Sequence, residues 1–425
     1  MKLRLLIGFC LGVAANAVGL LGAQTLEITP SRIMVDETAT IRVTGLGPRK
    51  HVTIDAALTD GAGGSWASTA EFVADESGVV DVAKQAPVKG AYHGVSAMGL
   101  IWSMMPTAKD VHVYQPPREF GVETIGFQVM ADGKQIASGQ LEQMAIREGV
   151  RQIKLKGALH GVFFIPEGTG QHPGVLVVGG SEGGVPQRKA AWLASHGYAA
   201  LALAYFHYED LPRSLENIPL EYFGEALSWM MQRPEVVPDK IAVMGTSRGG
   251  ELALQLGSMY PQIHAVVAYV PANVRYAACC GRTMGAAWTW KGQALAYVVP
   301  RMRQQTPLGD AAASIPVEQT HGPILVLSGE SDGVWESQAM TDAVMHRLKQ
   351  ANFAYRYERL NYPHAGHRVG APGIMPAWTG GVSHPISGES MNFGGTTQGN
   401  AESSLDATPK VLEFLQQSFA QTGSR

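Results

Sequence analysis

Cysteine is scarce in this chain: only three of its 425 residues are cysteines, and two of these, Cys279 and Cys280, are adjacent. Neighbouring cysteines can bridge only with strain, so the sequence predicts no disulfide framework and favours two small apolar core residues. Charge is scarce as well. Charged residues make up 16% of the chain and the net charge is −3, which gives no electrostatic basis for a nucleic-acid partner.

Long apolar runs are missing everywhere except at the start of the chain. Lys2 and Arg4 precede an uncharged apolar stretch that begins at Leu5 and ends in small residues around Ala23. This is the layout of a secretory signal peptide, here residues 1–23, and it predicts export to the periplasm or the outside of the cell. The stretch is almost long enough to span a bilayer, so an uncleaved membrane anchor is the alternative, and no other membrane contact is expected.

The remaining length is too great for one ordinary core and predicts two domains. Hydrophobic residues reach 45% of the chain, which excludes a disordered protein. Residues 24–145 contain short segments that alternate apolar and polar residues and are separated by Gly and Asp, with a hairpin about Asp132 and Gly133. This pattern predicts an immunoglobulin-like antiparallel β-sandwich.

Residues 146–425 follow a different pattern, in which apolar strands alternate with amphipathic helices, and this predicts an α/β domain with a mostly parallel sheet. About fifty residues without clear periodicity interrupt this alternation after residue 270, and a segment of that length is often a lid over a site. We expect strands at 173–178, 198–206, 240–245, 264–270, 322–329 and 353–360, and helices at 187–197, from 219, at 337–350 and after an N-cap at Asp406.

The pattern G-x-S-x-G occurs twice, around Ser181 and around Ser247. In a nucleophile elbow a strand ends in a tight turn and a helix begins at once, which exposes the serine oxygen. Ser247 fits, because "KIAVMG" precedes it and the helical stretch "GGELALQLGSMY" follows it. Around Ser181, further glycines and Pro186 delay the next helix, so this loop suits the donation of backbone N–H groups to an oxyanion instead.

A serine nucleophile needs a base and an acid that orients the base. The strand "GPILVLSG" is followed by Glu330 and Asp332, and the strand "FAYRYERL" is followed by His364 and His367. Asp332 lies in a turn beyond the strand end, and His367 lies on a flexible loop after a glycine, so we favour Asp332 and His367 within each pair. The chain order Ser, Asp, His is that of an α/β-hydrolase.

The chain also resembles a known family, the type I acyl-CoA thioesterases and the bile acid-CoA:amino acid N-acyltransferases. The similarity is carried by "ITPSRIMVDETATIRVTGL", "AYHGVSAMGLIWSM", "ALAYFHYEDLPRSLENIPLEYFGEAL", "MGTSRGGELAL" and "YPHAGH". The resemblance implies a β-sandwich followed by an α/β-hydrolase domain, with Ser247 as nucleophile, Asp332 as acid and His367 as base. In this family the thioesterases carry serine at the nucleophile and the amidating acyltransferases carry cysteine, so Ser247 favours hydrolysis.

The predicted reaction is the hydrolysis of an acyl thioester through an acyl-enzyme on Ser247. The oxyanion is expected to bind the backbone N–H of Arg248 and one of those of Gly180, Ser181 and Glu182. Coenzyme A enters only as part of the substrate, and no separate cofactor or metal is expected.

Three alternatives remain: an exported carboxylesterase or peptidase-like hydrolase, an acyltransferase to glycine or taurine, and a catalytically inactive binding protein. Two cations follow the glycine loop, Arg188 and Lys189. They are expected to belong to a solvated face rather than to a phosphate site.

Overall fold

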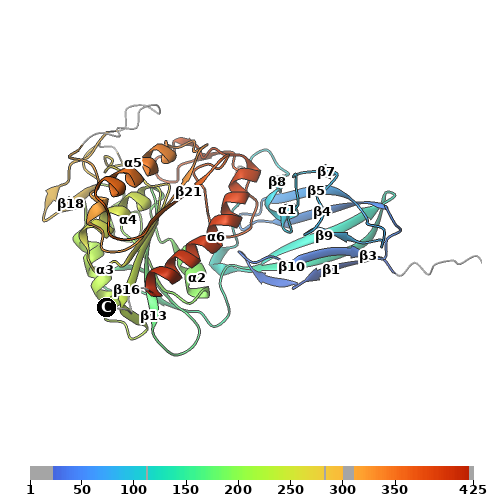
Figure 1. Cartoon of the computed structure of the whole chain (residues 1–425), viewed down its shortest axis with the longest axis horizontal. Coiled ribbons are helices and arrows are strands. Elements are labelled where there is room, and N and C mark those ends of the chain that lie inside the picture. The colour runs from blue at the N-terminus through green and yellow to red at the C-terminus, as the bar shows by residue number, and fades with distance from the viewer. Residues whose placement is uncertain (1–22, 112, 282–283, 300–310, 421–425) are drawn as a thin grey trace, which may run out of the picture.

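The computed structural model describes residues 23–111, 113–281, 284–299 and 311–420. The predicted signal peptide therefore lies, apart from Ala23, outside the described residues. Within these ranges no helix is both long and apolar enough to cross a membrane. Figure 1 shows an N-terminal β-sandwich on one side of the molecule and an α/β part on the other.

The sandwich consists of two sheets, one in the order β1-β3-β6 and one in the order β2-β10-β9-β4-β5-β7, with β8 paired to β5. Alternate residues of β4 and β9 are buried, as the sequence pattern requires. The predicted hairpin about Asp132 and Gly133 is confirmed, because it joins β9 to β10. The strands are Thr25–Thr29 (β1), Arg32–Met34 (β2), Thr40–Thr44 (β3), His51–Thr59 (β4), Ser65–Val73 (β5), Val80–Asp81 (β6), Lys89–Gly90 (β7), Met105–Pro106 (β8), Glu123–Ala131 (β9) and Lys134–Met144 (β10).

The α/β part is built on an eight-stranded sheet in the order β11-β12-β14-β13-β16-β17-β20-β21. Strands β14 to β21 run parallel, and β11 and β12 form an antiparallel edge. The predicted α/β fold is confirmed. The strands are Arg151–Lys154 (β11), His160–Ile165 (β12), His172–Val178 (β13), Ala199–Ala204 (β14), Val236–Thr246 (β16), Ala265–Tyr269 (β17), Ile324–Gly329 (β20) and Tyr357–Tyr362 (β21).

Helices cover both faces of this sheet. One hydrophobic cluster packs α3 (Glu221–Met231), α4 (Arg248–Met259) and α5 (Ser337–Gln350) against one face. A second cluster packs α2 (Gln187–Ser195) and α6 (Thr397–Ala420) against the other. Strands buried on both faces read as continuous apolar runs, which is why the sequence pattern identified them.

Two predicted boundaries at the C-terminal end are wrong. The last helix begins at Thr397 rather than after Asp406, because Thr396 Oγ1 accepts a hydrogen bond from the Gly399 N–H at 2.9 Å and so caps it. Asp406 lies inside the helix and accepts hydrogen bonds from Tyr362 and Lys410. The last strand is Tyr357–Tyr362 rather than 353–360, because the chain is still turning after α5 at Asn352, where φ is 48°.

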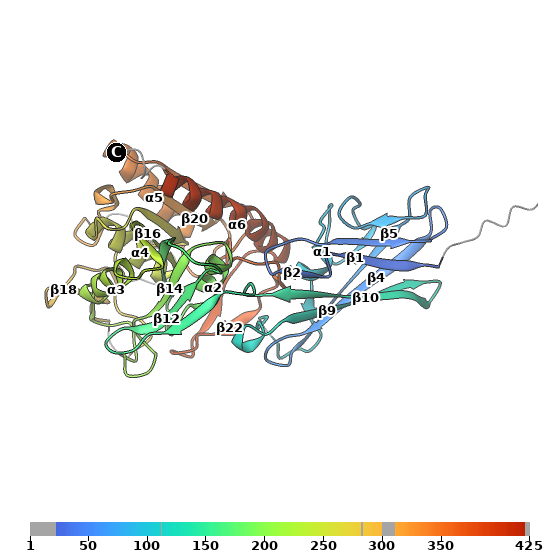
Figure 2. The same ribbon diagram turned by 90° about the horizontal axis from the view of Figure 1, so that it is seen from below.

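Helix α6 also reaches the sandwich (Figure 2). Ala401 is part of the sandwich core cluster and Leu405 packs against it, close to the short helix α1 (Gly99–Trp102). The segment after β17 adds β18 (Trp288–Trp290) and β19 (Gln293–Ala294), which pair with β15 (Ile218–Pro219). A hairpin of β22 (Gly381–Ser383) and β23 (Ser390–Asn392) precedes α6.

Candidate active site

Ser247 occupies a sharp turn between the end of β16 and the start of α4. Its φ is 59°, a strained value for a residue with a side chain, and its N–H donates to the Tyr269 carbonyl at 2.9 Å. The flanking glycines are needed, because a Cβ on Gly245 would collide with the Gly249 backbone. This is the geometry that presents a serine oxygen at the carboxyl edge of a parallel sheet.

Asp332 and His367 are brought together by the loops that follow β20 and β21. His367 Nδ1 lies 2.9 and 3.0 Å from the two carboxylate oxygens of Asp332, so this nitrogen donates and Nε2 is left as an acceptor. Asp332 Oδ1 also accepts the backbone N–H groups of Val334 and Trp335 at 2.9 and 3.2 Å. The carboxylate is thereby fixed and orients the imidazole.

Two aromatic rings hold the imidazole of His367 in place. Phe393 stacks on it at a centroid distance of 6.1 Å, and Trp335 meets it edge-on at 5.5 Å. The side chain of His367 is therefore restricted to few orientations. Ser247 lies at the same edge of the sheet, and its Oγ makes no hydrogen bond among the residues described.

The rival acid and base lie elsewhere. Glu330 accepts a hydrogen bond from Asn361 at 2.8 Å and is exposed, and His364 is exposed. Neither takes part in the pairing of Asp332 with His367.

The glycine loop after β13 lies against the nucleophile. A Cβ built on Gly180 would be 3.3 Å from Ser247 Cβ, so the backbone of this loop can approach the reacting carbonyl. The Gly180 N–H, however, already donates to Glu182 Oε1 at 3.0 Å. The sequence predicted a role only for the backbone N–H of Glu182. In the structure its side-chain carboxylate also takes part, as the acceptor of the Gly180 N–H.

Ser181 is bonded to a histidine that the sequence did not single out. His384 Nδ1 accepts the N–H groups of Ile386 and Ser387, both at 3.2 Å, so a neutral ring carries its proton on Nε2. Burial lowers the pKa of His384 and favours this neutral form. Nε2 therefore donates to Ser181 Oγ at 3.1 Å, and His384 anchors Ser181 instead of removing its proton.

Cys279 and Cys280 form a disulfide, so their interpretation as two separate apolar residues is wrong. Cys280 Sγ lies 3.5 Å from the Ser181 carbonyl oxygen and 3.7 Å from His384 Nε2. The long segment after β17 thus contacts the glycine loop beside the nucleophile.

The two cations after the glycine loop are not on a solvated face, and that prediction is wrong. Lys189 Nζ donates to Thr246 Oγ1 at 2.6 Å and lies 3.9 Å from the centre of the Tyr269 ring. Burial lowers the pKa of Lys189 to about 8. Arg188 donates to the Pro117 carbonyl. Helix α2 packs against the sheet and turns these side chains inward, which local sequence does not reveal.

Arg248 connects α4 to the segment that follows β17. Its Nε lies 3.0 Å from Glu251 Oε2 in a fully enclosed ion pair, and its Nη1 donates to the Ala277 carbonyl at 2.8 Å. Glu251 Oε1 in turn accepts from Trp288 Nε1 at 2.7 Å. Burial raises the pKa of Glu251, and the Arg248 charge opposes that shift. The pair fixes the first turn of the helix whose N–H groups point at the site.

One group in the described part of the chain has the ligand types of a metal site: His160, Glu209 and Asp210. The two ring nitrogens of His160 face different carboxylates, at 2.8 Å from Glu209 and 3.3 Å from Asp210. Lys154 already pairs with Glu209 at 2.7 Å. A single ion could use only one of those nitrogens, so the group is better described as a surface network of charges.

Comparison with known proteins identifies two matching families in succession. Residues 36–157 match the acyl-CoA thioester hydrolase/BAAT N-terminal region, and residues 218–421 match the BAAT/acyl-CoA thioester hydrolase C terminal. Both parts of the chain are thus matched in the expected order.

Similar proteins from Mus musculus cover almost the whole chain. Acyl-coenzyme A thioesterase 6 is 31% identical over 410 residues, covering 93% of this chain and 96% of that protein. Peroxisomal succinyl-coenzyme A thioesterase is 30% identical over 421 residues, covering 95% and 99%. Acyl-coenzyme A amino acid N-acyltransferase 1 is 31% identical over 419 residues, covering 94% of this chain and 99% of that protein.

Among solved structures, a dienelactone hydrolase-like promiscuous phosphotriesterase from metagenomic libraries aligns at a TM-score of 0.41 and 19% identity, covering 63% of this chain and 97% of that one.

Proposed function

Because this chain belongs to the family of acyl-CoA thioesterases and bile acid-CoA:amino acid N-acyltransferases, we propose that it hydrolyses acyl-CoA-type thioesters through an acyl-enzyme on Ser247. One observation carries the proposal: a strained serine at a strand–helix turn shares a sheet edge with a hydrogen-bonded Asp332–His367 pair. Coenzyme A is part of the substrate, and the proposed chemistry uses no further cofactor.

In the proposed mechanism, His367 Nε2 accepts the proton of Ser247 as its oxygen attacks the thioester carbonyl. Asp332 holds the Nδ1–H and stabilises the imidazolium. The oxyanion is stabilised by the backbone N–H of Arg248 and by one N–H of the loop Gly180–Glu182, each worth roughly 3 kcal/mol. The protonated imidazole then gives its proton to the leaving thiolate, and water activated by His367 releases the acid.

A substrate panel tests this reaction. Purified protein is given palmitoyl-CoA, a p-nitrophenyl ester, a lactam and a dipeptide amide, with release of free thiol, nitrophenol or amine as the readout. We expect the highest kcat/KM for the thioester. If only the ester or the amide is cleaved, the chain is a carboxylesterase or a peptidase-like hydrolase instead.

Acyl transfer is the second candidate, because an amino acid N-acyltransferase is among the relatives. Serine at position 247 favours hydrolysis, because the amidating members of the family characteristically carry cysteine there. Adding glycine or taurine to the thioester assay and measuring the conjugate by mass spectrometry separates the two. We expect free acid as the product, and conjugate in excess of free acid would assign a transferase.

We also propose that the protein is exported, on the basis of the predicted signal peptide at residues 1–23. Coenzyme A is a cytosolic cofactor, so an exported enzyme would meet other thioesters or esters of the same chemical class. Cell fractionation and sequencing of the mature N-terminus test this. A mature chain that begins near Gln24 supports export with cleavage, whereas an intact N-terminus in the membrane fraction supports an anchor.

The Glu182 carboxylate competes with the oxyanion for the Gly180 N–H. Replacing Glu182 by glutamine exchanges a charged acceptor for a neutral one, which weakens this bond by about 1 kcal/mol. We expect kcat/KM for the thioester to rise roughly fivefold, measured by initial rates. Glu389 is an exposed carboxylate in the hairpin of β22 and β23. Glu389→Gln is the control, and its kcat/KM should equal that of the wild type. A fall in kcat/KM in the Glu182 variant would mean that the carboxylate positions the loop productively.

A further inference from the structure

The hairpin of β22 and β23 contacts two parts of the candidate active site that come from distant segments of the chain. Both strands are three residues long, and in each of them only the middle side chain is half-buried. These two side chains, Val382 and Met391, are paired with each other. A two-stranded hairpin with so little buried surface is marginally stable by itself, so its position depends on what its two ends bind.

The turn of the hairpin reaches the glycine loop after β13 through His384. This side chain is buried, and its Nδ1 accepts the N–H groups of Ile386 and Ser387. Its Nε2 lies 3.1 Å from Ser181 Oγ. One ring nitrogen therefore closes the turn of the hairpin, and the other holds Ser181. Ile386 packs against a core cluster of the α/β part and keeps the turn in contact with it.

The glycine loop is held at both of its ends by residues that follow β14. The Tyr205 hydroxyl donates to the Gly179 carbonyl at 2.7 Å, and the Gly184 N–H donates to the Phe206 carbonyl at 3.1 Å. The residues between these ends supply the backbone N–H groups that we propose for the oxyanion. His384 contacts this middle part, so it acts on the donors themselves.

The other end of the hairpin contacts the loops that carry Asp332 and His367. The Phe393 carbonyl accepts the N–H of His367 at 2.7 Å and the N–H of Gly333 at 3.2 Å. A Cβ on Gly366 would collide with the same carbonyl oxygen, so the two backbones are in direct contact. The residue after β23 thus fixes the backbone on which both the acid and the base are carried.

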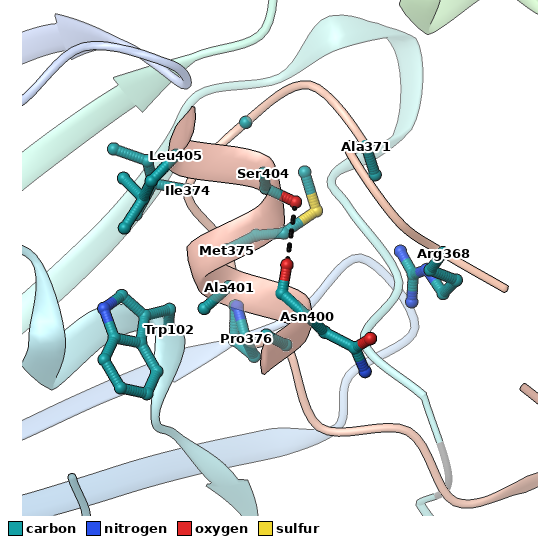
Figure 3. A pocket seen from close by; sticks show the side chains of 12 residues that line it. Trp102, Arg368, Ala371, Ile374, Met375, Pro376, Asn400, Ala401, Ser404 and Leu405 are labelled. Atoms are coloured by element: carbon teal, nitrogen blue, oxygen red, sulfur yellow. Dashed lines mark hydrogen bonds between the residues drawn. The ribbon is translucent and has the colours of Figure 1, made fainter. Parts of the chain in front are cut away.

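Asn400 of α6 fastens this second end. Its Oδ1 accepts the Gly366 N–H at 2.8 Å, and its Nδ2 donates to the Gly394 carbonyl at 3.5 Å. Figure 3 shows the Asn400 amide pointing away from the helix. One side chain therefore ties the loop of His367 and the end of the hairpin to the same helix, while the turn of the hairpin reaches across to Ser181.

We propose that the hairpin of β22 and β23 positions the oxyanion donors of the glycine loop relative to His367, and that His384 is the positioning residue at its turn. The inference rests on the proposed reaction at Ser247. An oxyanion donor is effective only at about 2.7–3.1 Å from the developing charge, so a small shift of the loop lowers the rate more than it weakens substrate binding. His384 acts through Ser181 and takes no proton.

Two substitutions separate the two nitrogens of His384. His384→Asn keeps an acceptor near the position of Nδ1, so the turn can still close, but its amide is too short to reach Ser181. His384→Gln places an N–H donor near the position of Nε2 and restores the bond to Ser181. Ser383→Ala, at the exposed neighbouring residue of the same hairpin, is the control.

Amide hydrogen exchange tests the position of the loop without any substrate. The reporter is a peptide covering residues 177–186, which contains the hydrogen-bonded N–H groups of Gly180, Gly183 and Gly184. We expect exchange about fivefold faster in His384→Asn, the factor that one neutral hydrogen bond is worth. His384→Gln should stay within about twofold of wild type by the same reasoning, and Ser383→Ala should equal wild type.

Kinetics test the consequence for the reaction. His384→Asn should lower kcat about fivefold with little change in KM, and fluorophosphonate labelling of Ser247 should slow by the same factor. His384→Gln should restore both. Ser181→Ala removes the other partner of the same hydrogen bond, so the double variant with His384→Asn should be no slower than either single variant.

Unchanged exchange of the loop in His384→Asn, or losses in kcat that multiply in the double variant, would overturn the proposal. If His384→Asn does not fold, Ser181→Ala should by itself speed exchange of the loop about fivefold, and no change there would be equally decisive. Absence of thioester turnover in the wild type would contradict the proposed function. Hydrogen exchange would still decide whether His384 holds the loop, so the two proposals can fail separately.

Discussion

Replacing Ser247 by alanine is expected to lower kcat for thioester hydrolysis by about 10⁴-fold or more, with little change in unfolding temperature. The reason is chemical: without the hydroxyl no acyl-enzyme forms, and His367 has no proton to accept. Ser247 is 9% exposed and its side chain makes no hydrogen bond within the described chain, so alanine leaves no buried group unpaired. Steady-state thiol release and labelling by a fluorophosphonate probe measure the loss.

Ser181→Ala is the matched control, because both serines satisfy the same motif. Ser181 Oγ accepts a hydrogen bond from the His384 Nε2–H and has no base among the described residues, so this variant should stay within about tenfold of wild type. The opposite outcome, loss of probe labelling in Ser181→Ala and retention in Ser247→Ala, would contradict the assignment. Failure of the probe to label either serine would instead favour a catalytically inactive binding protein.

The sequence was sufficient to predict the residues of the candidate site that follow strand ends. Buried parallel strands are apolar runs, and the residues after each run must emerge at one edge of the sheet, so chain order placed the candidate serine, acid and base there. Order left two candidates for each role, and local features such as the helix directly after Ser247 led to the choice of Ser247, Asp332 and His367. The start of the last helix could not be predicted in this way. Thr396 caps that helix, and its capping hydrogen bond depends on the direction in which the preceding hairpin leads the chain.

Residues whose role depends on packing between distant segments could not be predicted. His384 and Cys280 reach Ser181 from more than 90 residues away, and no periodicity marks them. Lys189 looks like an ordinary surface cation, because the strand that it contacts, β16, is far away in the sequence. In the sandwich, strands of two residues such as β6 carry no pattern, so the division into two sheets was not predictable in detail.

Asp332→Asn is expected to lower kcat by about 10⁴-fold while leaving KM nearly unchanged. The amide oxygen can still accept the N–H groups of Val334 and Trp335, which keeps the side chain in place. Its NH₂ group then faces His367 Nδ1 and donates to it, which drives the imidazole proton to Nε2. In that tautomer Nε2 can no longer accept the proton of Ser247.

Glu330→Gln is the control for this change, since Glu330 is the other carboxylate after β20 but is exposed and bonded to Asn361. It should retain wild-type kcat. Both variants are measured by initial rates of thiol release across pH, because a wrong tautomer lowers kcat at every pH where wild type is active. Equal losses in the two variants, or a selective loss in Glu330→Gln, would contradict the proposed Asp332–His367 pair.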